Sequence, residues 1–278
     1  CLEAKCTTDL HIKQGEKQGT AWLREQINGL LRSEEAPLRI AAEELPEDYL
    51  LSFTPEEILA HLRLHRDQAP VLQQKVLLFP EKRQGSWSLL MVCQDRQSLL
   101  AKLCGALALH NLSVLAARIF TWPDGTVVDR LDLSPEAAIS FEEQDWNALE
   151  YDLNQAINYR LDVGRNLYNK LESSLYGQRR QVQKATDKVI IDNDASARHT
   201  VIEVYGNDRP GTLYQLTRTL SDFRLNIHRA RIATEVEQLI DVFYLTTEHQ
   251  EKIRDQEFLS GVQKTLLHII REGEEKTS

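Results

Sequence analysis

The sequence has little sulfur and no long apolar stretch. Its four cysteines show neither a CxxC pair nor the spacing of a disulfide framework, which argues against a structural zinc site and against a disulfide-rich secreted domain. No apolar run approaches the ~20 residues that a membrane-spanning helix requires. A net charge of −9 argues against nucleic acid as a partner, because binding a phosphate backbone requires a basic face. These absences predict a cytoplasmic protein that binds neither membrane nor nucleic acid.

The common catalytic and metal motifs are also missing. The chain contains no Walker loop, no GxSxG elbow and no zinc motif, so we expect neither a cofactor nor a metal. His61 and His65 lie one helical turn apart, as two metal ligands would, but no third ligand is evident and solvated side chains are the simpler interpretation. The only methionine is Met91 and the chain starts at Cys1, so we expect a fragment or a processed form of a longer protein.

What is present is typical of a folded chain. With 42% hydrophobic and 27% charged residues, the 278-residue chain can form two or three modest domains. Residues 200–247 have the clearest pattern, which predicts a strand, a turn, a helix and two further strands. The turn is Asn207-Asp208-Arg209-Pro210-Gly211, in which proline fixes φ and glycine permits close backbone approach. Helix and strands in this order predict an α+β unit.

The same pattern occurs earlier in the chain at a constant offset of 113 residues. The matches fall on the turn, on the apolar helix positions and on one strand: Asp95-Arg96 with Asp208-Arg209, Leu100, Leu103 and Leu107 with Leu213, Leu216 and Leu220, and Ala117-Arg118-Ile119 with Ala230-Arg231-Ile232. At an offset of 112, Asp129 also matches Asp241. Identities at core positions of one pattern are unlikely to arise by chance, so the sequence predicts a duplicated domain.

Each repeat begins with an additional apolar run, at 76–79 and at 189–192. A leading strand could pair where the last strand of an ordinary βαββαβ unit lies. We therefore expect, in each repeat, a four-stranded antiparallel sheet in permuted order with two helices on one face. Capping boxes at Thr54 with Glu57 and at Ser140 with Glu143 predict two helix starts, the first helix ending near His65.

The repeat resembles the ACT domain, a small regulatory module that binds amino acids in metabolic enzymes. The Asp-Arg-Pro-Gly turn, the Leu-Asn-Ile entry to the next strand (225–227) and the Arg-Ile-Ala-Thr strand (231–234) carry this resemblance. The run KVIIDNDAS at 188–196 and the segment EDYLLSFTPEEILAHLRLH at 47–65 are similar to the C-terminal region of bacterial PII uridylyltransferase/uridylyl-removing enzymes. The resemblance is most specific in the second repeat and weakest before residue 45.

This resemblance implies two ferredoxin-like ACT domains preceded by a short helical segment. We predict a helical segment or linker at 1–70, a first ACT-like domain at 71–177 and a second ACT domain at 178–278. The two catalytic domains of the resembled enzymes have no counterpart here: no Asp-x-Asp pair follows Gly85-Ser86, and Arg66 separates His65 from Asp67. We therefore expect no catalysis by this segment.

The turn before each helix is the candidate ligand site. A helix N-terminus carries roughly half a positive charge and can hold an α-carboxylate, while Asp208 can accept hydrogen bonds from an α-ammonium group. The predicted residues, of which Asn226 is implied by the resemblance alone, are Asp208, Arg209, Gly211, Thr212, Leu213, Asn226 and Ile227. The alternative is that Asp208 only caps the helix and Pro210-Gly211 only makes the turn.

The first repeat departs from this pattern. Gln97-Ser98 replaces Pro-Gly, and Ser113 replaces the asparagine, so we expect at most a weaker site around Asp95, Ser98 and Ser113. The resemblance implies an amino-acid sensor, with glutamine as the ligand, that acts on the catalytic domains of a parent enzyme and through them on the PII protein in nitrogen metabolism. The alternatives are an interaction module that binds no ligand and forms homo-oligomers through its sheets, and an enzyme with an unrecognised site.

Overall fold

The computed structural model describes residues 19–32, 35–136, 140–174, 187–207, 209–235 and 238–275. The chain divides into two compact units. The first, here called the helical unit, comprises the described part of Cys1–Gln74 together with Trp122–Thr126. The second, here called the sheet unit, comprises Lys75–Thr121 and the described part of Val127–Ser278. Both sequence repeats belong to the sheet unit, apart from Trp122–Thr126 of the first repeat. The predicted boundary at 177/178 falls outside the described residues.

The helical unit contains a helix at 19–30. Three more helices follow it, namely α2 (Ala36–Glu44), α3 (Glu47–Leu50) and α4 (Pro55–Leu72). The capping box of α4 forms as predicted: the Glu57 amide donates to Thr54 Oγ1 at 3.3 Å, and the Thr54 amide donates to Glu57 Oε2 at 2.9 Å. The helix continues past His65, where we predicted its end, and includes Pro70. The buried Leu72 at its end explains the extra turns, because its contacts offset the hydrogen bond that proline removes.

The two histidines of α4 are paired with other side chains of the helical unit. His61 is buried, and its Nδ1 lies 2.6 Å from the hydroxyl of Tyr49. His65 Nε2 lies 3.0 Å from Asp124 Oδ2, and this contact lowers the pKa of the Asp124 carboxyl to about 2. The expectation that both side chains are simply solvated was wrong, because the Trp122–Thr126 loop packs with this helix in the same unit.

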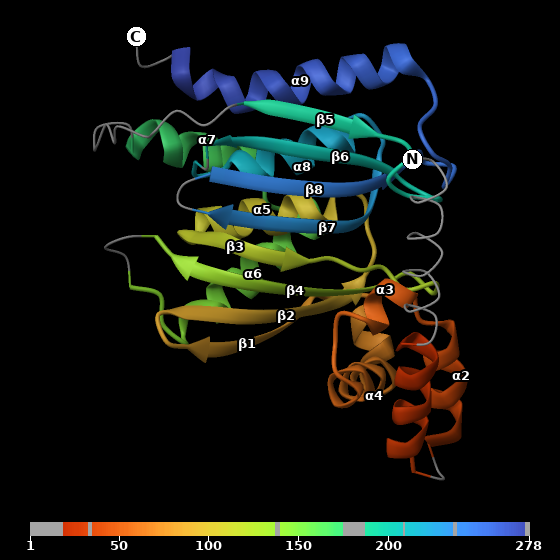
Figure 1. Ribbon diagram of the computed structural model, residues 1–278. Helices are drawn as coiled ribbons and strands as arrows, with labels where there is room; N and C mark the ends of the chain where they lie inside the picture. Colours follow the sequence, from red (N-terminus) through yellow and green to blue (C-terminus); the bar gives the residue numbers. More distant parts are fainter. Residues whose placement is uncertain are drawn as a thin grey trace. The chain divides into compact units, whose positions relative to one another are not determined.

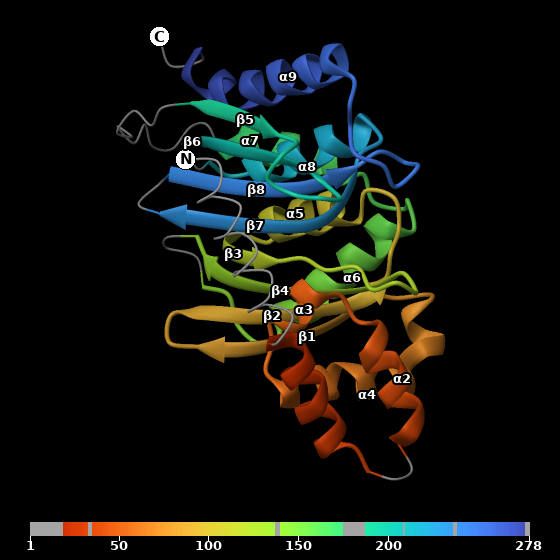
Figure 2. The ribbon, with the colours of Figure 1, turned by 45° about the vertical axis from the view of Figure 1, so that its right-hand side comes forward.

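The sheet unit is built on one eight-stranded sheet, in the order β1-β2-β4-β3-β7-β8-β6-β5 (Figures 1 and 2). The strands of the first repeat are β1 (Leu77–Arg83), β2 (Ser86–Gln94), β3 (Leu112–Arg118) and β4 (Thr126–Pro135). Those of the second are β5 (Lys188–Asp192), β6 (Thr200–Asn207), β7 (Asn226–Glu235) and β8 (Gln238–Thr246). The leading strands β1 and β5 pair antiparallel with β2 and β6, so the permuted arrangement is confirmed.

The two repeats meet where β3 pairs antiparallel with β7. Arg118 lies opposite Arg231, and these residues are one repeat length apart (231 − 118 = 113). A pair of matching residues that face each other marks a two-fold relation between the repeats. The α+β fold of two ferredoxin-like units is thus present as a single continuous sheet.

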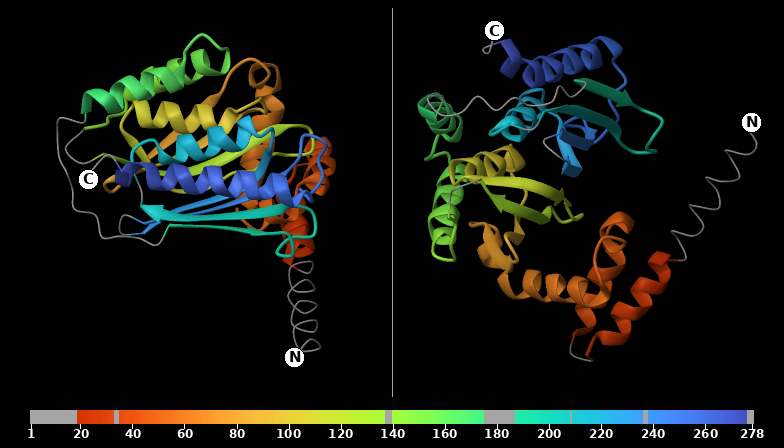
Figure 3. Two further views of the ribbon diagram at one scale, coloured as in Figure 1. Left: turned by 90° about the horizontal axis from the view of Figure 1, so that it is seen from above. Right: turned by 60° about the vertical axis from the view of Figure 1, so that its left-hand side comes forward.

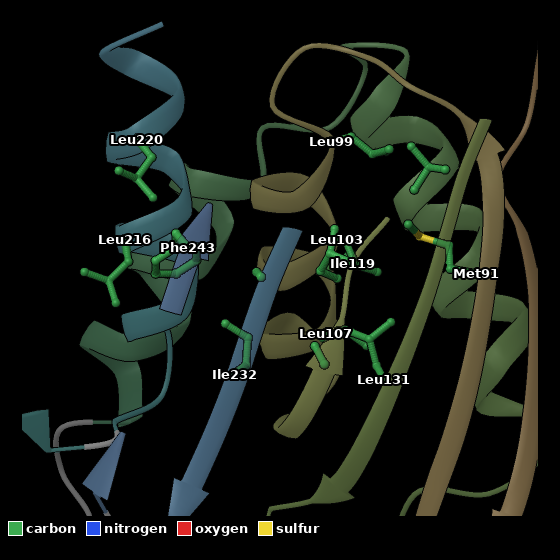
Figure 4. Packing of buried hydrophobic residues seen from close by; sticks show 14 of the residues in the cluster. Met91, Leu99, Leu103, Leu107, Ile119, Leu131, Leu216, Leu220, Ile232 and Phe243 are labelled. Carbon is green, nitrogen blue, oxygen red and sulfur yellow. The ribbon is translucent and has the colours of Figure 1, made fainter. Parts of the chain in front are cut away.

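The helices of the sheet unit lie on one face of the sheet (Figure 3). The first repeat contributes α5 (Leu99–Leu109) and α6 (Asp145–Ile157), the second contributes α8 (Thr212–Asp222) and α9 (Gln256–Glu275), and α7 (Val163–Ser174) follows the first repeat. The predicted helix stripes form the core, in which Leu103, Leu107, Leu216 and Leu220 pack with side chains of the strands (Figure 4). One apolar cluster joins both repeats, because α5 and α8 lie side by side.

The capping box predicted at Ser140 does not form. Ser140 Oγ donates to Glu142 Oε1, and α6 begins at Asp145 with Gln144 as an N-cap that makes no side-chain hydrogen bond. Asp145 instead accepts the Glu142 amide at 2.7 Å, and the helix begins four positions later than the sequence pattern suggested, with Gln144 rather than Ser140 as its N-cap (144 − 140 = 4). In the described part of the chain, no helix is both long and apolar enough to cross a membrane.

Candidate ligand site between the two repeats

The two helix-start turns of the sheet unit have the same backbone form. Gly211 precedes α8 with φ of 85°, and Ser98, its match in the first repeat, precedes α5 with φ of 59°. Neither N-cap supplies a side-chain hydrogen bond to the first helical amides. Each helix therefore begins with amide donors that no N-cap side chain serves, the kind of donor that can hold an anion.

Gly211 is required for a reason that the sequence did not reveal. Any other residue at this position would have to adopt the left-handed backbone conformation. Its Cβ would lie 3.3 Å from Leu171 and 3.4 Å from Leu167, both in α7. We expected the missing side chain to open a path for a ligand to the backbone. The structure instead fills that space with α7, so the glycine serves the turn and the packing of the helix.

A cavity of about 90 Å³ lies beside this turn, between the two repeats. One water needs roughly 10–15 Å³ of such space, so the cavity has room for a molecule of about the size of an amino acid. The first repeat lines it with Cys104, Ala108, Leu112, Ser113, Val114 and Glu136. The second repeat lines it with Arg209, Pro210, Gly211, Leu213, Tyr214, Ile232, Leu239 and Asp241.

Four of the predicted site residues thus come together here, namely Arg209, Gly211, Leu213 and Ser113. Asp208 lies outside the described residues. Thr212 is buried and its amide donates to the Arg209 carbonyl, which closes the turn without lining the cavity. Ile227 is partly buried against the apolar cluster.

Asn226 does not line this cavity; its Nδ2 donates to the Thr247 carbonyl at 3.2 Å. The residue that faces the Arg209–Gly211 turn is Ser113, the match of Asn226 in the first repeat. This follows from the antiparallel pairing of β3 with β7, which brings the turn of one repeat to the strand of the other.

The first repeat's turn has a different environment. Ser98 Oγ lies 2.5 Å from Ser221 Oγ of the second repeat, and burial raises the pKa of the Asp95 carboxyl. Neither Ser98 nor Asp95 lines the cavity described above. The contact with Ser221 uses the Ser98 hydroxyl to join the two repeats.

Arg209 and Tyr214 are held by neighbouring helices. Arg209 Nη2 donates to the carbonyls of Ile270 and Ile269 in α9, at 2.6 and 3.3 Å. Tyr214 packs where two glycines allow close approach, since a Cβ at Gly105 would lie 2.8 Å from its ring and one at Gly164 would lie 2.5 Å from its hydroxyl. These contacts fix one wall of the cavity.

Sequence reasoning missed the acidic side of the cavity. Asp241 is only 2% exposed, and Glu136 is half-buried. Burial raises the pKa of the Cys104 thiol, and the nearby Asp241 carboxylate adds to the effect. The signal for Asp241 was available, because an aspartate interrupts the apolar strand 239–245 and recurs as Asp129 in the first repeat.

Comparison with known proteins agrees with the geometry. Residues 188–272 match the protein family described as "ACR9-like, ACT-like domain". The chain is 34% identical over 224 residues to the bifunctional uridylyltransferase/uridylyl-removing enzyme of Gluconobacter oxydans, which covers 79% of this chain and 23% of that protein. It is 32% identical to the enzyme of the same description from Azospirillum brasilense, over 80% of this chain and 24% of that protein.

Similarity to solved structures is low. The aspartate kinase of Synechocystis aligns with a TM-score of 0.34 and 14% identity, over 70% of this chain and 28% of that one. This score is too low to support a conclusion.

The chain spans about a quarter of the length of the curated relatives it matches. With its matched repeats and its ACT-like second domain, the chain corresponds to the tandem ACT region of the bifunctional uridylyltransferase/uridylyl-removing enzymes.

Proposed function

We propose that this chain is the amino-acid-sensing regulatory segment of a uridylyltransferase/uridylyl-removing enzyme, with glutamine as its ligand. The observation that carries the proposal is the cavity lined by both repeats, with Ser113 on one side and the Arg209–Leu213 turn on the other. A ligand that contacts both repeats binds one arrangement of the pair more tightly than any other. Such differential affinity is what a regulatory ligand requires.

The described lining of the cavity offers groups for the α-carboxylate of an amino acid. The amides at the start of α8 and the half-buried Arg209 suit the α-carboxylate. The α-ammonium group would be held by Asp208, as expected from the sequence. Charge-assisted hydrogen bonds of this kind contribute roughly 1.5–3 kcal/mol each.

The proposed role is cytoplasmic and belongs to nitrogen metabolism. Ligand binding in the ACT pair would bias catalytic domains of the parent enzyme between uridylylation of PII and its reversal. The segment itself would catalyse neither reaction, since its sequence lacks the Asp-x-Asp pair and the His-Asp dyad of those domains. Uridylyl transfer to PII by the isolated chain, abolished by a substitution within it, would contradict this part.

A ligand-free interaction module is the main alternative, and the strand pairing makes it less attractive. β3 and β7 already pair within one chain, which leaves β1 and β5 as the outer edges of the sheet. β1 contains Pro80 and the charged residues Glu81, Lys82 and Arg83, features that protect an edge from pairing with another chain. Homo-oligomers through the sheets would therefore have to use β5 or a sheet face.

Calorimetric titration of the purified chain with a panel of amino acids tests the proposal. We expect glutamine to bind and to raise the melting temperature. Asp208→Ala should weaken binding by about 10–100-fold, because one charge-assisted bond is lost at ~1.4 kcal/mol per decade. Asp95→Ala, the matching change in the first repeat, is the control and should have a smaller effect. Absence of binding to any amino acid at millimolar concentration would overturn the proposal.

A further inference from the structure

Three arginines, here called the arginine row, lie side by side across neighbouring strands of the sheet. In the antiparallel pairing, Arg118 of β3 lies opposite Arg130 of β4 on one side and opposite Arg231 of β7 on the other. Residues directly opposite each other in a sheet point to the same face, with Cβ atoms only about 4.5–5.5 Å apart. The three side chains therefore start from one line that crosses the junction of the two repeats.

The arginine row lies on the face of the sheet that points away from the core. The neighbours of these arginines along their strands, namely Ala117, Leu131 and Ile232, are buried in the apolar cluster. Because successive side chains of a strand point to opposite faces, the arginines point away from that cluster. Arg118 and Arg231 are exposed. The row is thus on the opposite face of the sheet from the cavity, which Ile232 lines.

The surroundings hold one end of the row and leave space at the other. Arg130 Nε donates to Ser88 Oγ at 3.2 Å, its Nη2 atom lies 3.9 Å from Glu81 Oε2, and its side chain is 19% exposed. Beside the other two arginines, on the same face, Ala116 of β3 lies opposite Ala233 of β7. These short side chains leave space next to the two exposed guanidinium groups.

Positive charge gathers on this face. Two further carboxylates there contact other groups: Asp132 lies 3.8 Å from Arg83, and Glu203 accepts the hydroxyl of Tyr205 at 2.6 Å. A fourth arginine, Arg229, lies on the same face of β7. The junction of the repeats therefore presents several guanidinium groups together, although the chain as a whole carries a net charge of −9.

The row suits an anion that carries more than one charge. Like charges opposite each other in a sheet cost stability, and an anion placed between them offsets that cost. Arginine is better than lysine for this purpose, because its planar fork donates two parallel hydrogen bonds to one oxyanion. A single carboxylate carries one charge and can neutralise only one guanidinium group. A phosphate-type anion can accept hydrogen bonds from two of them at once.

We propose that the arginine row binds a small, multiply charged oxyanion of the phosphate class, which bridges Arg118 of the first repeat and Arg231 of the second. The anion accepts hydrogen bonds from both guanidinium groups and so joins the two repeats across the pairing of β3 with β7. This site lies on the opposite face of the sheet from the proposed amino-acid site and does not depend on it.

Thermal unfolding of the full chain, with pyrophosphate as the probe, tests the site. A ligand of the folded state stabilises it by mass action, so ~10 mM pyrophosphate with a dissociation constant of about 1 mM should raise the melting temperature by about 2 °C. Sodium chloride at the same ionic strength is the reference, since salt alone also screens the arginines. Orthophosphate, which carries fewer charges, should give a smaller shift. A pyrophosphate shift no larger than that of sodium chloride would overturn the proposal.

Variants separate the arginine row from the general charge of the chain. Arg118→Gln and Arg231→Gln each remove one charge-assisted contact, which should weaken binding about 10-fold. The pyrophosphate shift, measured from each variant's own melting temperature, should then fall to less than about half. Arg224→Gln is the matched control, because it removes the same charge from an exposed arginine outside the row. An undiminished shift in both row variants, or an equal loss in the control, would refute the site.

A ligand series on the wild-type chain covers the case in which a row variant does not fold. A polyglutamate peptide, added at the same total anionic charge as pyrophosphate, presents carboxylates instead of phosphate groups and should give the smaller shift. A larger shift with the peptide would mean that this face docks an acidic protein segment, and it would overturn the proposal of a small phosphate-type ligand.

Discussion

Arg118 and Arg231 lie directly opposite each other where β3 pairs with β7, and both are exposed. They occupy the same position of the two repeats, one repeat length of 113 residues apart. A two-fold relation between strands of similar sequence makes such self-pairing unavoidable. Like charges directly opposite in a sheet destabilise it.

Replacing one of these arginines should therefore stabilise the sheet unit. We expect Arg231→Glu to raise the free energy of unfolding by about 0.2–1 kcal/mol, because it converts a repulsive cross-strand pair into an attractive one. Urea denaturation at low and high salt measures the effect, which should shrink as salt screens the charges. Arg231→Gln should give a smaller gain. A loss of stability in both variants would show that the arginines do not repel.

The turn before α8 should tolerate no side chain at Gly211. Gly211→Ala should destabilise the chain by about 1–2 kcal/mol, because alanine pays for a positive φ and its Cβ meets Leu167 and Leu171 of α7. Gly261→Ala is the control: nothing lies within 4 Å of its added Cβ in α9, and alanine favours a helix by about 1 kcal/mol. The melting temperatures of the two variants should shift in opposite directions. Shifts of the same sign would refute the role of Gly211 in the turn and in the packing against α7.

Arg224 follows α8 with φ of 56°, and its side chain is 77% exposed. The left-handed conformation costs a residue with a Cβ about 1–2 kcal/mol, and glycine avoids that cost. We expect Arg224→Gly to be more stable than Arg224→Ala by about 1 kcal/mol in chemical denaturation. The alanine variant controls for loss of the long ion pair with Glu248, which is 3.9 Å. Equal stability of the two variants would contradict the prediction, because it would mean that the backbone at residue 224 leaves the left-handed conformation at no cost.

Asp129 should make stability depend on pH. Burial raises the pKa of this carboxyl well above its usual value, and the nearby Asp95 charge adds to the effect. A raised folded-state pKa means that the associated stability is complete below the ordinary value of 3.8 and is lost as pH rises through the folded-state pKa.

Asp129→Asn should remove this loss. Its side-chain oxygen can still accept the Phe120 amide, which donates to Asp129 at 3.2 Å. Chemical denaturation between pH 3 and pH 8 measures the effect. The free energy of unfolding of the variant should rise relative to that of the wild type as pH rises. A constant difference across this range would contradict the prediction.

The capping box of α4 should contribute measurably to stability. Thr54→Ala removes the acceptor of the Glu57 amide and should cost about 1 kcal/mol. Ser140→Ala is the control, because Ser140 resembles a cap in sequence but caps no helix in the structure. Its effect should stay within about 0.5 kcal/mol. Equal losses in the two variants would mean that the Thr54 contact is not specific.

The sequence by itself determined the repeated unit. The apolar stripes at Leu103, Leu107, Leu216 and Leu220 and the leading strands at 76–79 and 189–192 follow from local periodicity, which depends only on neighbouring residues. These predictions were confirmed, as was the resemblance to the uridylyltransferase/uridylyl-removing enzymes. The turn at 207–211 was also visible, because proline and glycine leave a local signal.

Only the tertiary structure decided how the repeats combine. The antiparallel contact of β3 with β7 brings Ser113 to the turn before α8 and leaves Asn226 elsewhere, an outcome that local pattern cannot encode. Asp241 is buried beside a cavity that both repeats line, and α7 fills the space beside Gly211. A site formed by two repeats depends on the register between distant strands, and the packing of the whole core sets that register.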